Sequence, residues 1–222
     1  MKKIGLCAIA LLMAAFFAVQ PNISWADASK LSAAGAVLQE IQGIPETEIP
    51  PQLFRNAHGI AIIPDLIKGS FIVGARYGKG VLAANFGGKW SAPVFITMGG
   101  TSVGLQLGAE STDIVLVFKT DRSIQAFRTG KFTLGADAAV AAGPVGRHAE
   151  ASTDIELKAE IYAYSRSRGL FGGVALEGTV LSVDADENVA FYGRAVTADE
   201  ILTGKVEAPP AAAGFMEVLE RY

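Results

Sequence analysis

The residues with the clearest catalytic pattern are GTSVG at positions 100–104, which fit the G-x-S-x-G motif of serine hydrolases. In those enzymes the serine lies on a sharp turn between a strand and a helix. Here apolar residues alternate with small or polar ones from Thr101 to Ala109, which is the period of an extended strand. The pattern therefore predicts a strand at Ser102, where a hydrolase needs its turn.

Partners for Ser102 exist in the required order, because Asp113, Asp121 or Asp137 precedes His148. His148, however, follows the glycine-rich segment AGPVG, which is typical of a loop. A short motif without its structural context is weak support for an enzyme. Catalysis by Ser102 and His148 is therefore the least favoured functional hypothesis, and we expect no enzymatic activity.

Other motifs for binding ions are incomplete. The segments GARYGKG and MGGTSVG lack the G-x-x-x-x-G-K-[ST] pattern of a phosphate loop. DADEN at 184–188 resembles the start of a calcium loop, but Val189 and Ala195 replace the glycine and the glutamate that such a loop needs. Glu110 and Asp113 are three apart on a predicted strand, so their side chains face opposite sides. Two histidines and one cysteine offer little to a transition metal, and we expect no metal and no cofactor.

The first 26 residues have the pattern of a secretory signal peptide. Two lysines precede an uncharged apolar run from Ile4 to Val19, and a cleavage site of the A-x-A type follows at residues 24–26. The run is shorter than the roughly 20 apolar residues of a membrane-spanning helix. We therefore expect export and cleavage after Ala26.

Cleavage would leave residues 27–222, which we expect to form a single domain with its core at about residues 41–204. The only cysteine, Cys7, would leave with the signal peptide, so the exported domain would have no disulfide. We expect a periplasmic protein, either free or attached peripherally to an envelope membrane.

Charge is moderate in total and uneven along the chain. The predicted exported domain has 17 basic and 22 acidic residues, a net charge of −5 (17 − 22), which argues against nucleic acid as a partner. Positions 55–147 hold ten Lys or Arg and five Asp or Glu, whereas positions 148–204 hold four and ten. The two parts either complement each other within the domain or present a basic patch to anionic headgroups.

Periodic patterns predict the secondary structure. Helical spacing or helix signals occur at residues 28–42, 51–56, 121–129, 199–203 and 215–222. Six β-rich runs lie between residues 59 and 119, and Ile155 to Ala163 alternate with a polar face that includes Tyr162 and Tyr164. The segments on either side of Ala185-Asp186-Glu187 predict a hairpin.

Glycine makes up 25 of the 222 residues, and many glycines lie inside strand patterns. Strand glycines mark bends or close approach of another backbone. We therefore predict a mainly β, α+β fold. It would have a curved antiparallel or barrel-like sheet, an N-terminal amphipathic helix and short C-terminal helices.

Several long segments resemble, in order, the SYLF domain family. They are AHGIAIIP (57–64), GKWSAPVFI (88–96), GTSVGLQLGAESTDIVLVF (100–118), YSRSRGLFGGVALEG (164–178) and the later Asn188, Tyr192 and Gly193. The resemblance covers about residues 41–204 and implies a non-enzymatic, lipid-binding module. Eukaryotic members engage phosphoinositides and membranes, and some also bind actin. We consider actin an implausible partner for an exported chain of bacterial type.

A lipid site is expected to combine cations near turns with apolar side chains. The candidates for binding headgroup phosphate through charge-assisted hydrogen bonds are Lys68, Arg76, Lys79, Lys89, Arg166 and Arg168. The candidates for membrane or acyl-chain contact are Phe71, Phe86, Trp90, Leu170 and Phe171. Taken singly, an aromatic residue of this kind lies more often in a protein core than in contact with a ligand.

The favoured hypothesis is binding of anionic phospholipid or a membrane surface in the bacterial cell envelope. An alternative is an envelope scaffold that binds protein partners through an exposed sheet edge or through the acidic later part. Binding to anionic vesicles at low salt favours the first hypothesis, because electrostatic attraction is least screened there. The sequence leaves the oligomeric state open.

Overall fold

In the computed structural model, the described residues are 25–44, 48–70, 73–103, 108–144, 159–167, 170–172 and 176–222. Residues 1–24 of the predicted signal peptide lie outside this set, as do Phe71, His148 and Arg168. For some strand residues the backbone is described but the side chain is not, and these include Ser102, Glu110, Leu170 and Phe171. The predictions made for these side chains stay predictions.

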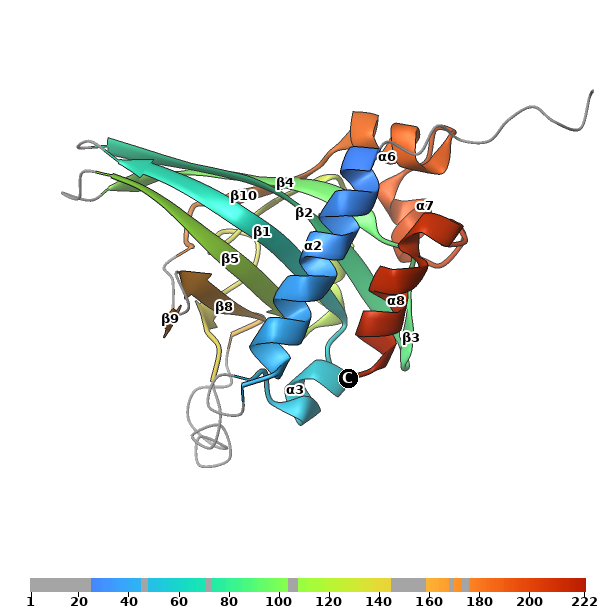
Figure 1. Cartoon of the computed structure of the whole chain (residues 1–222), viewed down its shortest axis with the longest axis horizontal. Coiled ribbons are helices and arrows are strands. Elements are labelled where there is room, and N and C mark those ends of the chain that lie inside the picture. Colours follow the sequence, from blue (N-terminus) through green and yellow to red (C-terminus); the bar gives the residue numbers. More distant parts are fainter. Residues whose placement is uncertain are drawn as a thin grey trace, which may run out of the picture.

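Within these described ranges, ten strands form one curled sheet (Figure 1). They are β1 (Gly59–Ser70), β2 (Val73–Phe86), β3 (Lys89–Trp90), β4 (Val94–Val103), β5 (Gly108–Phe118), β6 (Lys131–Thr133), β7 (Val140–Ala142), β8 (Ile161–Ser167), β9 (Leu170–Gly172) and β10 (Val180–Val183). The order is β6-β10-β4-β2-β1-β5-β8-β7, with β3 added to β2 and β9 added to β8. Among the described strands, every pairing is antiparallel except that of β7 with β8.

The helices are mostly short. They are α2 (Trp25–Gln42), α3 (Pro51–Arg55), α4 (Asp121–Phe127), α6 (Ala185–Tyr192), α7 (Ala198–Leu202), the 3-10 helix η1 (Pro210–Ala212) and α8 (Ala213–Glu220). α2 and α8 lie side by side across one face of the sheet (Figure 1). The predicted α+β fold with a curved sheet, an N-terminal helix and short C-terminal helices is confirmed. No helix among the described residues combines the length and apolar character needed to cross a bilayer.

The two faces of the sheet bury separate apolar layers. The inner layer lies within the curl, because Phe118 of β5 and Phe132 of β6 meet there with ring centroids 6.2 Å apart although their strands are far apart in the sheet. The outer layer lies between the sheet and α2, which contributes buried Leu31, Leu38 and Ile41. Because both faces are covered, the central strands are apolar on both sides.

The six β-rich runs of the sequence form only four long strands, because β1 and β2 take up the first three runs and β4 and β5 the last three. β1 continues through a bulge between Ile63 and Leu66, where its register with β5 shifts and Asp65 has φ 49°. In β2, a Cβ at Gly80 would lie 2.2 Å from the carbonyl oxygen of Ile62 on β1. Glycine at this position therefore permits the close strand packing that the sequence predicted.

The predicted hairpin around Ala185-Asp186-Glu187 is wrong, because these residues begin helix α6. The Asp184 side chain caps the helix by accepting a hydrogen bond from the Glu187 backbone N–H, and Gly193 ends it with φ 67°. The buried Asn188 then bonds to the backbone N–H and C=O of Phe95, both at 3.0 Å. These contacts attach the helix to β4.

The predicted polar face at Tyr162 and Tyr164 is also wrong. Both tyrosines lie on β8, both are 2% exposed, and both belong to the outer apolar layer. Burial raises the pKa of Tyr164, whose hydroxyl donates a hydrogen bond to the Pro144 carbonyl at 3.1 Å. Alternation identified the strand, but tyrosine is compatible with either face because its ring is apolar and its hydroxyl needs one partner.

Candidate functional site

The long β1–β2 hairpin lies between β4 and β5, and these four strands extend past the side of α2 (Figure 1). In the outer part of the hairpin, Ile67 pairs with Tyr77, and the next pair is Lys68 with Arg76. Neighbouring side chains on a strand point to opposite faces. The apolar pair and the cationic pair therefore lie on different faces, and we call these four residues the hairpin end.

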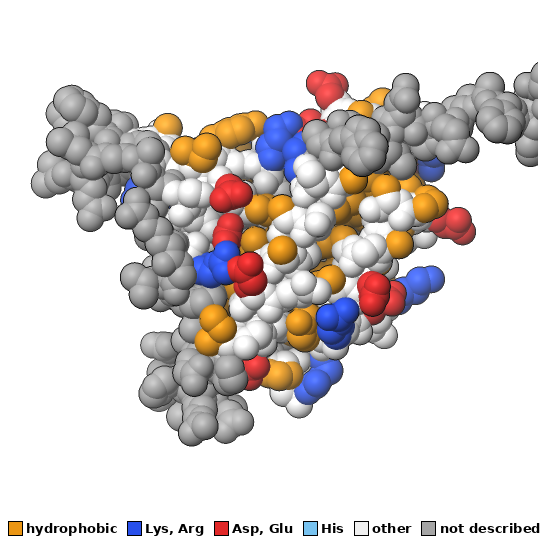
Figure 2. All heavy atoms as spheres, in the orientation of Figure 1, with side chains coloured by type: hydrophobic (Ala, Val, Ile, Leu, Met, Phe, Trp, Pro, Cys, Tyr) orange, Lys and Arg blue, Asp and Glu red, His pale blue; other side chains and the backbone are white. Residues whose placement is uncertain are grey.

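The surroundings of Gly78 show which pair lies on the inner face of the sheet and which on the outer face. A Cβ at Gly78 would lie 2.8 Å from Ile63 and 2.9 Å from Leu66, two residues of the inner layer. Alternation then places Arg76 on the inner face and Tyr77 on the outer face. Figure 2 shows apolar side chains at the surface over β1 and β2 beyond α2.

The apolar pair is open to solvent. Ile67 is 59% exposed and Tyr77 is 55% exposed, on a face that is otherwise covered by helices. The sequence did not predict either residue as a contact residue. The reason is the bulge in β1, which shifts the alternation so that Leu66 points inward and Ile67 outward.

The cationic pair lies on the inner face, where Lys68 and Arg76 are partly buried. Burial lowers the pKa of Arg76, but a guanidinium stays protonated at neutral pH. Gly100 stands opposite Arg76 on β4 and adds no side chain there, whereas the acidic position Glu110 stands opposite Lys68 on β5. The position opposite Arg76 on β4 is therefore uncharged, and the position opposite Lys68 on β5 is acidic.

Lys79 is engaged by acids of the chain itself. It lies on the outer face, and its Nζ is 2.7 Å from Asp184 Oδ2 and 2.9 Å from Glu187 Oε2. Hydrogen bonds to both carboxylates raise the pKa of Lys79. Burial opposes ionisation of Asp184, but the hydrogen bonds from Lys79 and from the Glu187 backbone lower the pKa of Asp184 below its ordinary value.

Arg166 is engaged in the same way. Its Nε and Nη2 lie 3.1 and 2.9 Å from Asp113 Oδ2, and its Nη1 contacts Glu40 of α2. Burial raises the pKa of Asp113, although the carboxylate also accepts a hydrogen bond from the Asp65 backbone at 3.0 Å. Arg166 therefore ties α2 to the sheet, on the face opposite to Lys68 and Arg76.

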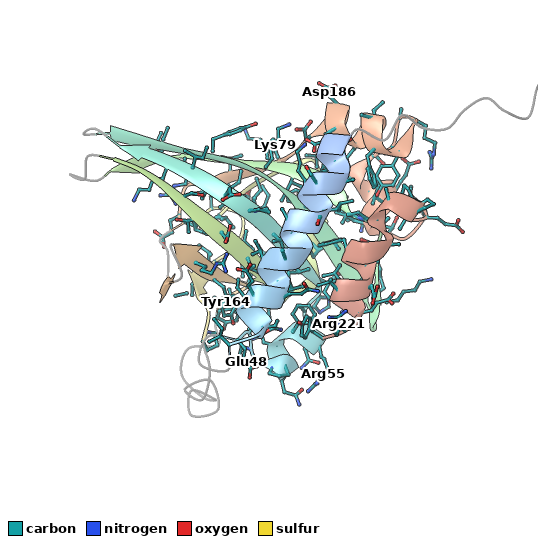
Figure 3. All side chains as sticks on the ribbon, viewed as in Figure 1. Glu48, Arg55, Lys79, Tyr164, Asp186 and Arg221 are labelled. Atoms are coloured by element: carbon teal, nitrogen blue, oxygen red, sulfur yellow. The ribbon has the colours of Figure 1, made fainter. Side chains whose placement is uncertain are left out.

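Lys89, Phe86 and Trp90 lie at the other end of β2, at the turn into β3. Phe86 is 48% exposed, whereas Trp90 is 7% exposed and packs on Phe54 with ring centroids 5.6 Å apart. Trp90 lines a cavity of about 620 Å³ with residues of α3, α8 and the β2–β3 turn, near Arg55 and Arg221 in Figure 3. The predicted cations are thus divided among both faces and both ends of the sheet, and their role in lipid binding stays a prediction.

The geometry at Ser102 does not fit a serine hydrolase. Ser102 lies within β4, and its backbone pairs with Gly74 of β2, so the chain is extended where a nucleophile elbow would turn. Asp113 is held by Arg166, and His148 lies outside the described residues. In the described part of the chain, no three His, Cys, Asp or Glu side chains are grouped to hold a metal ion.

The described part of the chain is a curled sheet with a helix across its outer face, and this architecture alone does not define a function. Residues 99–222 match the family Ysc84, described as "Las17-binding protein actin regulator". The chain belongs to this family, which confirms the resemblance to SYLF domains. The description names binding and regulation, not catalysis.

Three similar proteins come from eukaryotes. The chain is 38% identical over 197 residues to SH3 domain-containing YSC84-like protein 1 of Xenopus laevis, and 36% identical over 201 residues to the human protein of that name. It is 38% identical over 197 residues to LAS seventeen-binding protein 3 of Saccharomyces cerevisiae. The alignments cover 85%, 87% and 87% of this chain but 58%, 58% and 42% of those relatives. The chain thus matches only part of their length.

Proposed function

We propose that this chain is a non-enzymatic module that binds anionic phospholipid at a membrane surface of the bacterial cell envelope, after export and removal of residues 1–26. The observation that carries the proposal is the hairpin end. It presents two exposed apolar side chains, Ile67 and Tyr77, on one face and two cations, Lys68 and Arg76, on the other. This pairing of apolar and basic groups is typical of surfaces that lie at a membrane interface.

Each part of the hairpin end has a physical role in this proposal. Tyr77 and Ile67 would enter the headgroup region, where an aromatic ring is stable with its hydroxyl in water. Lys68 and Arg76 would attract anionic lipid, at roughly 1 kcal/mol per cation near the surface. Lys79 and Arg166 are less suited to this role, because each is already paired with two carboxylates.

Vesicle co-sedimentation of residues 27–222 tests the proposal. The double variant Ile67→Ser/Tyr77→Ser should bind vesicles of phosphatidylglycerol and phosphatidylethanolamine at least tenfold more weakly than the parent chain. A tenfold change in affinity corresponds to about 1.4 kcal/mol of binding free energy. Full burial of one apolar side chain contributes more than this. Phe86→Ser is the matched control, because Phe86 is exposed to a similar extent at the other end of β2.

Two outcomes would contradict the proposed surface. If the double variant binds as tightly as the parent chain, the hairpin end does not contact the membrane. If Phe86→Ser weakens binding instead, the contact surface lies at the β2–β3 turn with Lys89. Circular dichroism of each variant shows whether the fold is retained, which is expected because both substitutions are at exposed positions.

Protein binding is the second candidate function, and the family description favours it. That description names Las17 binding and actin regulation, so it removes the support for treating actin as an implausible partner. Co-sedimentation with filamentous actin, in the presence and absence of anionic vesicles, distinguishes the two functions. Binding to actin that vesicles do not displace would favour a scaffold over a membrane module.

A further inference from the structure

Five charged side chains meet where the N-terminal end of α2 reaches α6 and β2. They are Asp27 and Lys30 of α2, Lys79 of β2, and Asp184 and Glu187 of α6. Lys30 contacts Glu187 Oε1, lies 3.6 Å from Asp27 Oδ1 and stands 5.9 Å from the centre of the Phe95 ring. Figure 3 shows Lys79 beside this end of α2. We call these five residues the anchor cluster.

The anchor cluster is short of positive charge. It holds three carboxylates and two ammonium groups, and Asp27 and Glu187 are only 3% and 8% exposed. Among the described residues, the buried Oδ2 of Asp27 has no hydrogen-bond partner. Burial, and then the neighbouring charge of Glu187, raise the pKa of Asp27. A buried carboxylate oxygen without a donor is costly, so a further cation or donor beside Oδ2 of Asp27 would stabilise the cluster.

The expected cleavage site lies next to this oxygen. Cutting the chain after Ala26 would convert the Asp27 backbone nitrogen from an amide into an ammonium group. Three bonds separate this nitrogen from the Asp27 carboxyl carbon, so the two atoms lie within about 4 Å of each other in every rotamer. The new positive charge would therefore arise beside Asp27 and close to Glu187, which contacts the same end of α2 through Lys30.

We propose that removal of residues 1–26 completes the anchor cluster, with the new α-ammonium group of Asp27 as its third cation. This inference rests on the export and cleavage included in the proposed function. Processing would then balance three carboxylates with three cations and fix α2 onto α6 and β2. The positive end of the α2 dipole opposes an ammonium group. We expect the neighbouring carboxylates of Asp27 and Glu187 to outweigh this opposition.

The pH dependence follows from the ammonium group. An α-amino group has a pKa of about 7.7–8.0 in an unfolded chain, and pairing with carboxylates raises the pKa in the folded chain. Because the pKa is higher in the folded chain, the ammonium group stabilises the fold fully at pH values below the pKa of the unfolded chain. This stabilisation is lost as the pH rises through the pKa of the folded chain. The charged groups that face it are those of the anchor cluster, on α2, β2 and α6.

Two chains that differ by one residue test the proposal. One begins at Asp27 and the other at Ala26, each released from a fusion partner without added residues. The extra alanine moves the ammonium group away and restores an amide at Asp27. At pH 6–7 the chain from Asp27 should melt about 2–4 °C higher, the shift expected for roughly 1 kcal/mol in a domain of this size. The difference should disappear by about pH 10. Equal melting temperatures at pH 6–7 would overturn the proposal.

Substitutions in each chain identify the partner. Asp27→Asn should lower the melting temperature of the chain from Asp27, because it removes the carboxylate that faces the ammonium group. It should leave the stability of the chain from Ala26 unchanged or higher, because in that chain the anchor cluster has more carboxylates than cations. Asp186→Asn is the control, since Asp186 is exposed on α6 and should have the same effect in both chains. Equal effects of Asp27→Asn in both chains would overturn the proposal.

The vesicle assay on the same proteins keeps this inference separate from the proposed function. Both chains retain the hairpin end, so both should bind vesicles whatever the state of the anchor cluster. Mass spectrometry of the protein recovered from a bacterial periplasm should give a chain that begins at Asp27. A different first residue would overturn the inference about the anchor cluster and leave the hairpin end as the membrane contact.

Discussion

At the scale of single residues, glycine at position 80 is required by the approach of β1 to β2. A Cβ there would lie 2.2 Å from the Ile62 carbonyl oxygen, which is backbone and cannot rotate away. Gly80→Ala should therefore reduce the free energy of unfolding by about 2–4 kcal/mol, in the range of overpacking and backbone strain.

Gly99→Ala provides the control for Gly80→Ala. Gly99 also lies within a strand, but its added Cβ would meet only the Arg76 carbonyl oxygen, at 4.0 Å. Urea denaturation of both variants measures the difference. An equal loss from the two substitutions would show that strand propensity, and not close packing, accounts for the glycine.

Arg166 is the second residue with a testable structural role. Arg166→Ala would leave the largely buried Asp113 carboxylate without its cation, which should cost about 2–4 kcal/mol at pH 7. The pKa of Asp113 is already raised by burial and would rise further, so a protonated Asp113 would be tolerated better. The loss should therefore become smaller as the pH falls toward 4, where carboxyl groups titrate.

Lys205→Ala serves as the control for Arg166→Ala. Lys205 is 65% exposed and lies 3.7 Å from Asp199, and exposed pairs contribute about 0–1 kcal/mol. Denaturant unfolding at pH 7 and pH 4.5 gives the comparison. A loss for Arg166→Ala that does not change between these pH values would mean that Asp113 is not the group responsible.

At the scale of secondary-structure elements, α6 shows why part of the fold was missed. Alternation around residues 180–195 favoured a hairpin, whereas the chain forms a helix that is capped by Asp184 and ended by Gly193. Both ends carried a readable signal, since Asp184 is followed three residues later by Glu187 and Gly193 follows Tyr192. These signals did not distinguish a helix from a turn, because Asp and Gly are common both at helix ends and in β-turns.

Asn188 fixes α6 to the sheet. Its amide oxygen accepts from the Phe95 N–H, and its amide nitrogen donates to the Phe95 carbonyl at 3.0 Å and to the Asp184 carbonyl at 2.8 Å. Asn188→Ala would leave the buried Phe95 N–H without its partner, whereas the Phe95 carbonyl would keep the hydrogen bond from the Asp184 N–H at 3.0 Å. The substitution should therefore cost about 1–3 kcal/mol. Val189→Ala, at the next position and 42% exposed, should change the free energy of unfolding by less than about 0.5 kcal/mol. Similar losses for both variants would contradict this account.

The strands were easier to predict than the contact residues. Apolar alternation located the buried strands because the period of two is a property of the backbone. The exposure of Ile67 and Tyr77 depends on the bulge near Asp65, which no alternation pattern contains. The candidate site was therefore only partly predictable: Lys68 and Arg76 were named, and the apolar pair beside them was not.

At the scale of the whole molecule, many of the unevenly distributed charges of the sequence form ion pairs within the domain. Cations from the basic middle part pair with acids from the acidic later part, as in Lys79 with Asp184, Arg128 with Asp199 and Arg122 with Glu160. These pairs favour internal complementarity over a single large basic patch. A membrane contact must therefore come from a small local surface, and the hairpin end is a described surface that joins two exposed apolar side chains with two cations.

The orientation of the chain on a membrane is the central claim, and fluorescence quenching tests it most directly. In residues 27–222 with Trp90→Phe, a single tryptophan is introduced by Tyr77→Trp in one variant and by Phe86→Trp in the other. Vesicles of anionic lipid with brominated acyl chains then quench an indole that enters the bilayer. The account predicts quenching and a blue shift at position 77 and neither at position 86. Quenching at position 86 alone, or at neither position despite vesicle binding, would contradict it.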